Sequence, residues 1–166
     1  MNEPIIFLDI DGVLATNKQY NLNAVNFMHK NEWANKLKVK YPFDKGCVDI
    51  FNEILTETGA EIVLSSDWKY YYTLDQLDII FKENSVIKSP IDVTTDDMVS
   101  MSYLEKNRAY QIKTYIKTNK NEKYVIIDDL NLYNFYESLE NNFVRTYNSE
   151  GLKQLGVNDK IIKLLI

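Results

Sequence analysis

The stretch that decides the fold is Ile5-Ile6-Phe7-Leu8-Asp9-Ile10-Asp11-Gly12-Val13. Its first four residues are apolar without polar alternation, which is typical of a strand covered on both faces, as in a parallel sheet. The strand ends at two carboxylates, Asp9 and Asp11, and at a glycine that permits a tight turn. Ligands of open α/β sheets bind at the carboxyl ends of the strands. The stretch therefore predicts a parallel strand that leads into a binding site, although Asp-Gly is also common in surface turns.

Similar apolar runs recur later in the chain and alternate with segments of helical period. The further predicted strands cover residues 62–64, 124–127 and 143–146. Apolar residues at helical spacing predict helices within residues 48–55, 74–81, 104–116, 132–139 and 159–165. Strands and helices that alternate through right-handed crossovers form an open sheet with helices on both faces. We therefore predict an α/β, Rossmann-like fold with a parallel sheet.

The composition indicates one globular domain over residues 1–166. The chain is 45% hydrophobic and 26% charged, with five glycines and three prolines, which excludes a disordered linker and a collagen-like fibre. No apolar run approaches the roughly 18 residues of a membrane span. The single cysteine, Cys47, permits no internal disulfide. These features favour a cytoplasmic protein, and no pattern in the sequence requires an obligate protein partner.

Residues 15–45 are too many for a simple connection between a strand and a helix. This stretch is rich in Asn, Lys and aromatic residues, which give it enough apolar surface to fold against the rest of the chain. We predict that it forms a small lid insertion after the first strand, above the carboxyl edge of the sheet.

A second acidic pair, Asp128 and Asp129, follows the apolar run that ends at Ile127. Because strand ends meet at one edge of a parallel sheet, we expect these acids to lie near Asp9 and Asp11. Four close carboxylates would repel one another and raise their pKa values unless a cation balances them. Mg²⁺ binds one or two carboxylates together with substrate phosphate oxygens. The pattern therefore predicts a Mg²⁺ site that also binds a phosphorylated substrate.

The predicted strand 62–64 ends in two hydroxyl residues, Ser65 and Ser66. A hydroxyl and the neighbouring backbone N–H are suitable hydrogen-bond donors for a phosphate oxygen. The alternative is that Ser66 or Asp67 caps the amino end of a helix that starts near Trp68.

Arg108 is the most informative basic residue, because only two of the 19 basic residues are arginines. It lies four residues after Leu104 and four before Ile112, in the middle of a predicted apolar helix face. A cation on such a face requires an anionic partner. The acidic cluster and a bound phosphate would supply that partner, whereas the alternative is an arginine that extends to the surface and pairs with a local acid.

Together these residues resemble the haloacid dehalogenase (HAD) superfamily. The family's Asp-x-Asp-Gly-Val motif resembles Asp9 to Val13, its hydroxyl motif Ser65, its basic motif Arg108, and its terminal acidic motif Asp128 and Asp129. The resemblance extends to small HAD domains found with RNA-repair enzymes, which carry a Leu-Ser-Ser-x-Trp-Arg run. This chain departs from that run at Lys69, where arginine is usual, and at Asp67, where a small residue is common.

The resemblance implies a Mg²⁺-dependent phosphomonoesterase that works through an aspartyl-phosphate. Asp9 would be the nucleophile, and Asp11 would protonate the leaving group and then activate water. Ser65, Ser66 and Arg108 would bind the phosphate. The implied metal ligands are Asp9, Asp11 through its backbone carbonyl, Asp128 and Asp129, with Asp129 favoured over Asp128 as the direct ligand.

The leaving group is left open by the sequence. A net charge of −5 gives no long-range attraction for a polyanion, but the predicted insertion carries six lysines with aromatic residues between them. Those lysines are Lys18, Lys30, Lys36, Lys38, Lys40 and Lys45. They favour a nucleotide or a nucleic-acid end as the substrate. The alternatives are a small phosphorylated metabolite, and a non-catalytic module that only binds phosphate.

Overall fold

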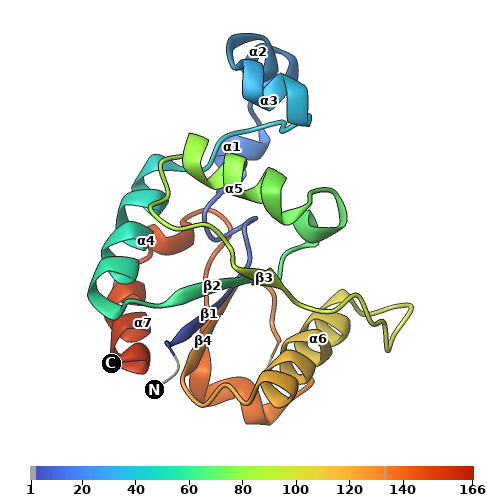
Figure 1. Ribbon diagram of the computed structural model, residues 1–166, viewed down its shortest axis with the longest axis vertical. Coiled ribbons are helices and arrows are strands. Elements are labelled where there is room, and N and C mark those ends of the chain that lie inside the picture. The colour runs from blue at the N-terminus through green and yellow to red at the C-terminus, as the bar shows by residue number, and fades with distance from the viewer. Residues whose placement is uncertain (1–2, 133) are drawn as a thin grey trace.

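The computed structural model describes residues 3–132 and 134–166. Five parallel strands form one open sheet in the order β3-β2-β1-β4-β5, with β1 at the centre (Figure 1). The strands are β1 (Ile5–Leu8), β2 (Glu61–Leu64), β3 (Asp92–Val93), β4 (Tyr124–Asp128) and β5 (Phe143–Arg145). The predicted Rossmann-like α/β fold is confirmed. The two-residue strand β3 was not predicted, because two residues show no periodicity.

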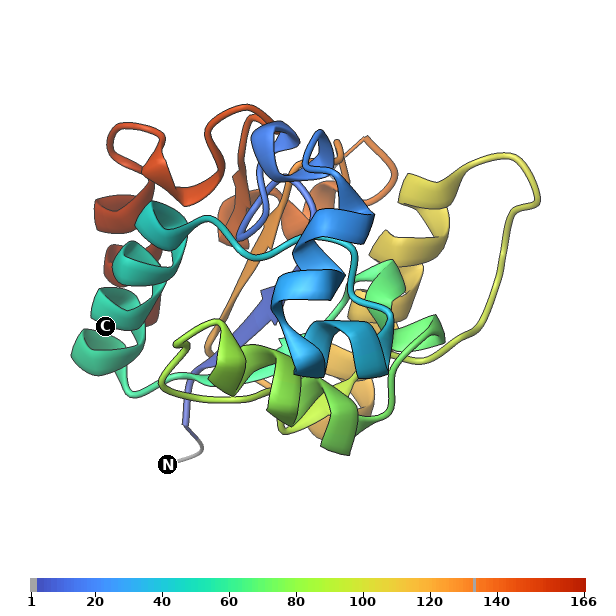
Figure 2. The same cartoon turned by 90° about the horizontal axis from the view of Figure 1, so that it is seen from above.

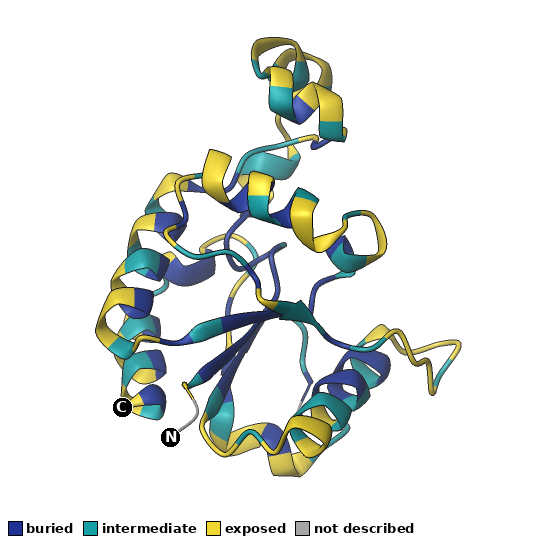
Figure 3. Ribbon diagram, viewed as in Figure 1, coloured by how far each residue is buried: buried dark blue, intermediate teal, exposed yellow. Residues whose placement is uncertain are grey.

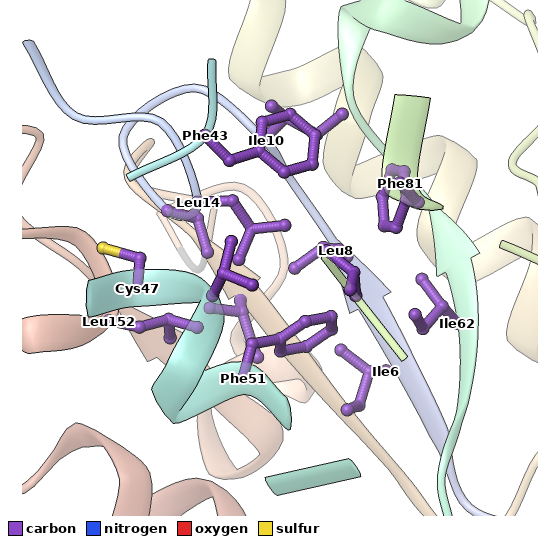
Figure 4. Packing of buried hydrophobic residues seen from close by; sticks show 14 of the residues in the cluster. Ile6, Leu8, Ile10, Leu14, Phe43, Cys47, Phe51, Ile62, Phe81 and Leu152 are labelled. Carbon is purple, nitrogen blue, oxygen red and sulfur yellow. The ribbon is translucent and has the colours of Figure 1, made fainter. Parts of the chain in front are cut away.

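Helices cover both faces of the sheet, because alternate residues of each buried strand point to opposite sides. On one face, Ile6 and Leu8 of β1 pack with apolar residues of α4 (Lys45–Thr58), α5 (Leu74–Glu83) and α7 (Val157–Leu165). On the other face, Ile5 and Phe7 pack with α6 (Leu104–Asn119). Figure 4 shows Ile6 and Leu8 beside Phe51 of α4. In Figure 3 the strands are mostly buried, and each helix turns an exposed face outward.

The predicted helix at residues 132–139 is wrong. The described part of this segment contains turns and the 3-10 helix η2 (Glu137–Asn142), but no α-helix. Its apolar spacing still serves packing, because Leu132 and Leu139 are buried against the face of the sheet that α6 covers. The chain turns just before this segment, where the carboxylate of Asp128 accepts a hydrogen bond from the Leu130 N–H at 2.9 Å. Such a bond directs the chain into a turn directly after β4.

Three short helices lie in the insertion: α1 (Asn17–Tyr20), α2 (Ala24–Lys30) and α3 (Glu32–Leu37). Figures 1 and 2 show α2 and α3 together, projecting beyond α5. Phe27 of α2 packs edge-on against Trp33 of α3, with the ring centres 6.0 Å apart. No helix in the described residues is both long enough and apolar enough to span a membrane. That the insertion acts as a lid stays a prediction.

Candidate active site

Three carboxylates meet at the carboxyl edge of the sheet, where β1 and β4 end side by side. Leu8 pairs with Ile127 in the parallel register, so Asp9 and Asp128 leave the two strands at the same level. One carboxylate oxygen from each of Asp9, Asp128 and Asp129 lies within 4.8 Å of the others. Asp9 and Asp128 are buried, and the backbone N–H of Ile10 donates to Asp9 Oδ1 at 2.8 Å. The expected convergence of the two acidic pairs therefore includes three of the four carboxylates.

Gly12 makes room for Asp129. Its φ of +80° lies in the left-handed region, and a Cβ at this position would lie 2.5 Å from Asp129 Cγ. The hydroxyl of Thr146, just after β5, donates to the Gly12 carbonyl at 2.7 Å. The glycine therefore serves both the turn and the close approach of the terminal acidic pair.

Arg108 lies within this acidic site, on the face of α6 that packs against the sheet. Its guanidinium contacts Asp9 Oδ2 at 2.8 Å and Asp128 Oδ2 at 3.0 Å through Nη1. Nη2 donates to Asp67 Oδ1 at 2.8 Å. Only 5% of the residue is exposed, so the alternative of an arginine that extends to the surface is wrong. Arg108 thus connects the ends of β1 and β4 to Asp67, which follows Ser65 and Ser66.

Negative charge exceeds positive charge around this guanidinium. Burial raises the pKa of both Asp128 and Asp129, and the negative charge of Asp9 adds to each increase, while Arg108 opposes it. A hard divalent cation with oxygen ligands would relieve this excess. Both oxygens of Asp128 are hydrogen-bonded, one to Arg108 and one to Leu130. Asp129 has only a 3.3 Å bond from the Asn148 amide in the described residues. The donor set fits Mg²⁺, with Asp129 the more available ligand.

The carboxylate of Asp11 is not part of the three-carboxylate cluster. It accepts a hydrogen bond from the Tyr41 hydroxyl at 2.8 Å and another from Trp68 Nε1 at 3.0 Å. Burial raises the pKa of Asp11, although these two bonds act against the increase. Two donors thus hold the Asp11 side chain apart from the other acids. Only its backbone carbonyl remains a predicted metal ligand.

The two predicted phosphate-binding serines occupy different roles in the structure. Ser65 Oγ is buried and has no hydrogen-bond partner among the described residues, and such groups are uncommon in folded proteins. Ser66 Oγ accepts from the Trp68 N–H at 3.5 Å and caps the 3-10 helix η1 (Asp67–Tyr70). The N-cap alternative therefore applies to Ser66, while Ser65 has a hydroxyl available to a ligand.

A model of one protein family matches residues 5–157 of the chain, and its description is the HAD domain in Swiss Army Knife RNA repair proteins. The chain belongs to this HAD family. The match begins at β1 and ends at the first residue of α7, so it includes every site residue described above. Searches of curated proteins and of solved structures found no match.

In this HAD domain, three partners of the predicted site residues were not assigned from the sequence. Tyr41 and Trp68 bind Asp11 across 30 and 57 residues of sequence. Asp67 binds Arg108 across 41 residues. The only sequence signal was the position of Asp67 and Trp68 directly after the hydroxyl pair. For Tyr41 there was no local signal, because its contact depends on how the insertion folds.

Lys69 of the HAD domain bonds residues outside the acidic site. Its ammonium donates to Thr95 O at 2.6 Å, to Gln111 Oε1 at 2.9 Å and to Thr94 Oγ1 at 3.0 Å. The side chain is 1% exposed, and burial lowers the pKa of Lys69 to about 8. Lys69 therefore connects η1 to the segment after β3 and to α6.

Proposed function

We propose that this HAD domain is a Mg²⁺-dependent phosphomonoesterase that hydrolyses the terminal phosphate of a nucleotide or a nucleic acid. The observation that carries the proposal is the environment of Asp9. Its carboxylate is buried and paired with Arg108 at 2.8 Å. Ser65, whose hydroxyl has no partner among the described residues, follows β2 at the same level, because Leu8 pairs with Leu64 in the sheet. A buried nucleophile with a fixed cation and a free hydroxyl nearby suits transfer of a phosphoryl group, whose negative charge must be held in place.

In the first step, a carboxylate oxygen of Asp9 attacks phosphorus and the bond from phosphorus to the leaving oxygen breaks. The product is an aspartyl-phosphate. The Arg108 guanidinium and the Ser65 hydroxyl would each bind an oxygen of the phosphoryl group as its charge spreads. The contact with Arg108 at 2.8 Å also holds the Asp9 carboxylate in place.

Asp11 would supply the proton that the leaving oxygen needs. The same carboxylate would then accept a proton from the water that attacks phosphorus, as the bond from phosphorus to the Asp9 oxygen breaks and phosphate leaves. A general acid must be protonated at the working pH, and burial raises the pKa of Asp11 in that direction. The hydrogen bonds from Tyr41 and Trp68 hold both oxygens of this group in fixed positions.

The residues that would hold the cation are Asp9, Asp129 and the backbone carbonyl of Asp11, with Asp128 in the same carboxylate cluster. A bound Mg²⁺ neutralises carboxylate and phosphate charge, so that the anionic nucleophile can approach the anionic substrate. The three-carboxylate cluster is the feature of this chain that supports the cofactor.

Membership of a family of HAD domains from RNA repair proteins supports a nucleic-acid end as the substrate. A small-metabolite phosphatase with the same mechanism is the second candidate. Both share the residues that act on the phosphoryl group and differ only in what binds the leaving group.

The test is hydrolysis of an aryl phosphate by the purified protein with Mg²⁺. We expect activity that is lost with a chelator, recovered with added Mg²⁺, and abolished by Asp9→Asn. The matched control is Asp49→Asn, because Asp49 is an exposed residue of α4 whose ion pair in the described residues is with Lys45 on the surface. Full activity in the Asp9→Asn protein would refute the mechanism. A protein that binds phosphate but hydrolyses no ester would be a non-catalytic module.

A further inference from the structure

An open cavity of about 680 Å³ lies next to Asp11, between the insertion and the residues that follow β2. Lys38, Lys40 and Tyr41 line it from the insertion, and Trp68, Tyr71 and Tyr72 line it from the other side. Ligand pockets measure about 300–1,000 Å³, so this cavity has more room than a phosphoryl group needs. Because Asp11 is the proposed proton donor to the leaving oxygen, the cavity lies where a leaving group would extend.

The aromatic residues of this cavity divide into a fixed group and a free ring. Trp68 packs against Tyr41 and Tyr72, with ring centres 6.0 Å and 5.4 Å away. Tyr71, in contrast, is 77% exposed, and its side chain has no hydrogen bond or ring contact among the described residues. A free tyrosine ring on a cavity wall is suited to stack on a nucleobase.

The cavity also carries two uncompensated cations. Lys38 and Lys40 are exposed, and in the part of the chain that the structure describes their ammonium groups form no ion pair or hydrogen bond. Lys45, also in the insertion, pairs with Asp49 instead. The one further carboxylate on the wall, that of Asp67, is bound by Arg108. Lysine ammonium groups are point charges that bind phosphates well, so this wall is suited to a second anion besides the phosphate at Asp9.

We propose that this cavity is a subsite for the nucleotide adjoining the scissile phosphate, with the base on Tyr71 and the next phosphodiester on Lys38 and Lys40. The inference rests on the proposed phosphatase function and extends it. It requires a substrate with at least one phosphodiester next to its terminal phosphate, and therefore selects nucleic-acid ends over mononucleotides and small phosphorylated metabolites.

The test compares kcat/KM for three substrates: a terminally phosphorylated trinucleotide, the matching nucleoside monophosphate and an aryl phosphate. The trinucleotide is made with the phosphate at its 5′ or its 3′ end. We expect kcat/KM for the better of the two trinucleotides to exceed that for the monophosphate by about tenfold or more, since it adds a phosphodiester that two lysines can contact. The double variant Lys38→Gly, Lys40→Ala should remove most of that preference. Tyr71→Ala should weaken both nucleotide substrates about tenfold relative to the aryl phosphate.

The chain offers a matched control for Lys38. Lys38 ends α3 in the left-handed conformation, with φ of +61°, and Lys120 ends α6 in the same way, with φ of +52°. Glycine is favoured at such positions, so both Lys38→Gly and Lys120→Gly should fold at least as stably as the parent. Only Lys38→Gly should lower the preference for the trinucleotide.

Equal kcat/KM values for the trinucleotide and the monophosphate, or a preference that survives the double lysine variant, would overturn the subsite. Binding gives a readout that is independent of turnover. The phosphorylated trinucleotide should bind the Asp9→Asn protein about tenfold more weakly when the two lysines are replaced, and unchanged binding would also overturn the proposal. If the proposed phosphatase function is wrong, the protein will not hydrolyse the aryl phosphate, and this result is distinct from the outcomes that concern the subsite.

Discussion

Arg108 sets the charge balance of the site from a single helical position. One guanidinium serves Asp9, Asp128 and Asp67, which come from three separate segments of the chain. The neighbouring Asn107 fixes the start of α6, because its side-chain oxygen accepts from the N–H groups of Val99 and Ser100 at 2.8 Å. These two bonds hold the segment before α6 against the residue that precedes Arg108. An arginine in this position both stabilises the buried acids and leaves N–H donors close to the nucleophile.

We expect Arg108→Ala to lower kcat/KM by about 30-fold, which corresponds to about 2 kcal/mol for a lost charge-assisted contact with the phosphoryl group. Arg108→Lys should retain part of the activity, because the charge remains while the second N–H direction is lost. Steady-state kinetics on an aryl phosphate, with thermal unfolding to confirm that each variant is folded, provides the measurement. Lys106→Ala on the same helix is the control. Unchanged kcat/KM in a folded Arg108→Ala protein would contradict the assignment.

At the scale of elements, the insertion contributes to the chemistry through Tyr41. The Tyr41 hydroxyl bonds Asp11, and its ring packs on Trp68, which bonds the same carboxylate. The position of the proposed proton donor therefore depends on how residues 15–45 pack onto the rest of the domain. This arrangement makes Tyr41 a positioning residue for Asp11.

We expect Tyr41→Phe to lower kcat about tenfold for an alkyl phosphate and less for an aryl phosphate, because an aryl leaving group needs less protonation. General damage to the fold would lower kcat equally for both esters, so a larger loss on the alkyl ester indicates a defect in proton transfer. Tyr20→Phe is the matched control: its hydroxyl donates to Ala15 O at 2.9 Å within the insertion and does not touch Asp11. An equal loss on both esters in Tyr41→Phe would refute the positioning role.

A second element, the segment after β3, is held by Lys69, whose pKa burial lowers to about 8 from the ordinary 10.5. Between these values the unfolded chain binds more protons than the folded protein, so the contribution of Lys69 to stability increases as the pH rises through this window. We expect the free energy of unfolding of the parent, relative to Lys69→Met, to increase between pH 8 and pH 10.5. Urea unfolding at several pH values measures the difference. A constant difference would show that the pKa of Lys69 is not lowered.

The elements differ in how far the sequence determines them. β1, β2 and β4 were predictable because each contains a run of apolar residues buried on both faces. β3 was not, since Asp92 and Val93 form a strand only by pairing with Val63 and Leu64 of β2. Residues 132–139 have helical spacing, but the side chain of Asp128 binds Leu130 and starts a turn instead. The outcome there depended on a side-chain hydrogen bond that periodicity does not reveal.

At the scale of the whole molecule, the order of strands brought the predicted acids together. Asp9 follows β1 and Asp128 ends β4, and these strands are adjacent in the sheet, so this part of the site followed from topology alone. The environment of Asp11 did not follow, because it depends on the irregular path of the insertion. The six lysines of that insertion also separate in space. Only Lys38 and Lys40 line the cavity at Asp11, whereas Lys36 lines another with Trp33.

The net charge of −5 opposes the approach of a polyanion, so any attraction for nucleic acid must be local to these two lysines. For single strands, the slope of log affinity against log salt is about −0.7 for each neutralised phosphate. Because Lys38 and Lys40 would neutralise one phosphodiester, log kcat/KM for a phosphorylated oligonucleotide should fall more steeply than for an aryl phosphate, by about 0.7 in slope. The measurement varies monovalent salt at constant free Mg²⁺, and the double lysine variant should bring the two slopes together. Equal slopes in the parent protein would refute the nucleic-acid end as the substrate and leave the phosphatase mechanism intact, because that mechanism uses only the residues at the strand ends.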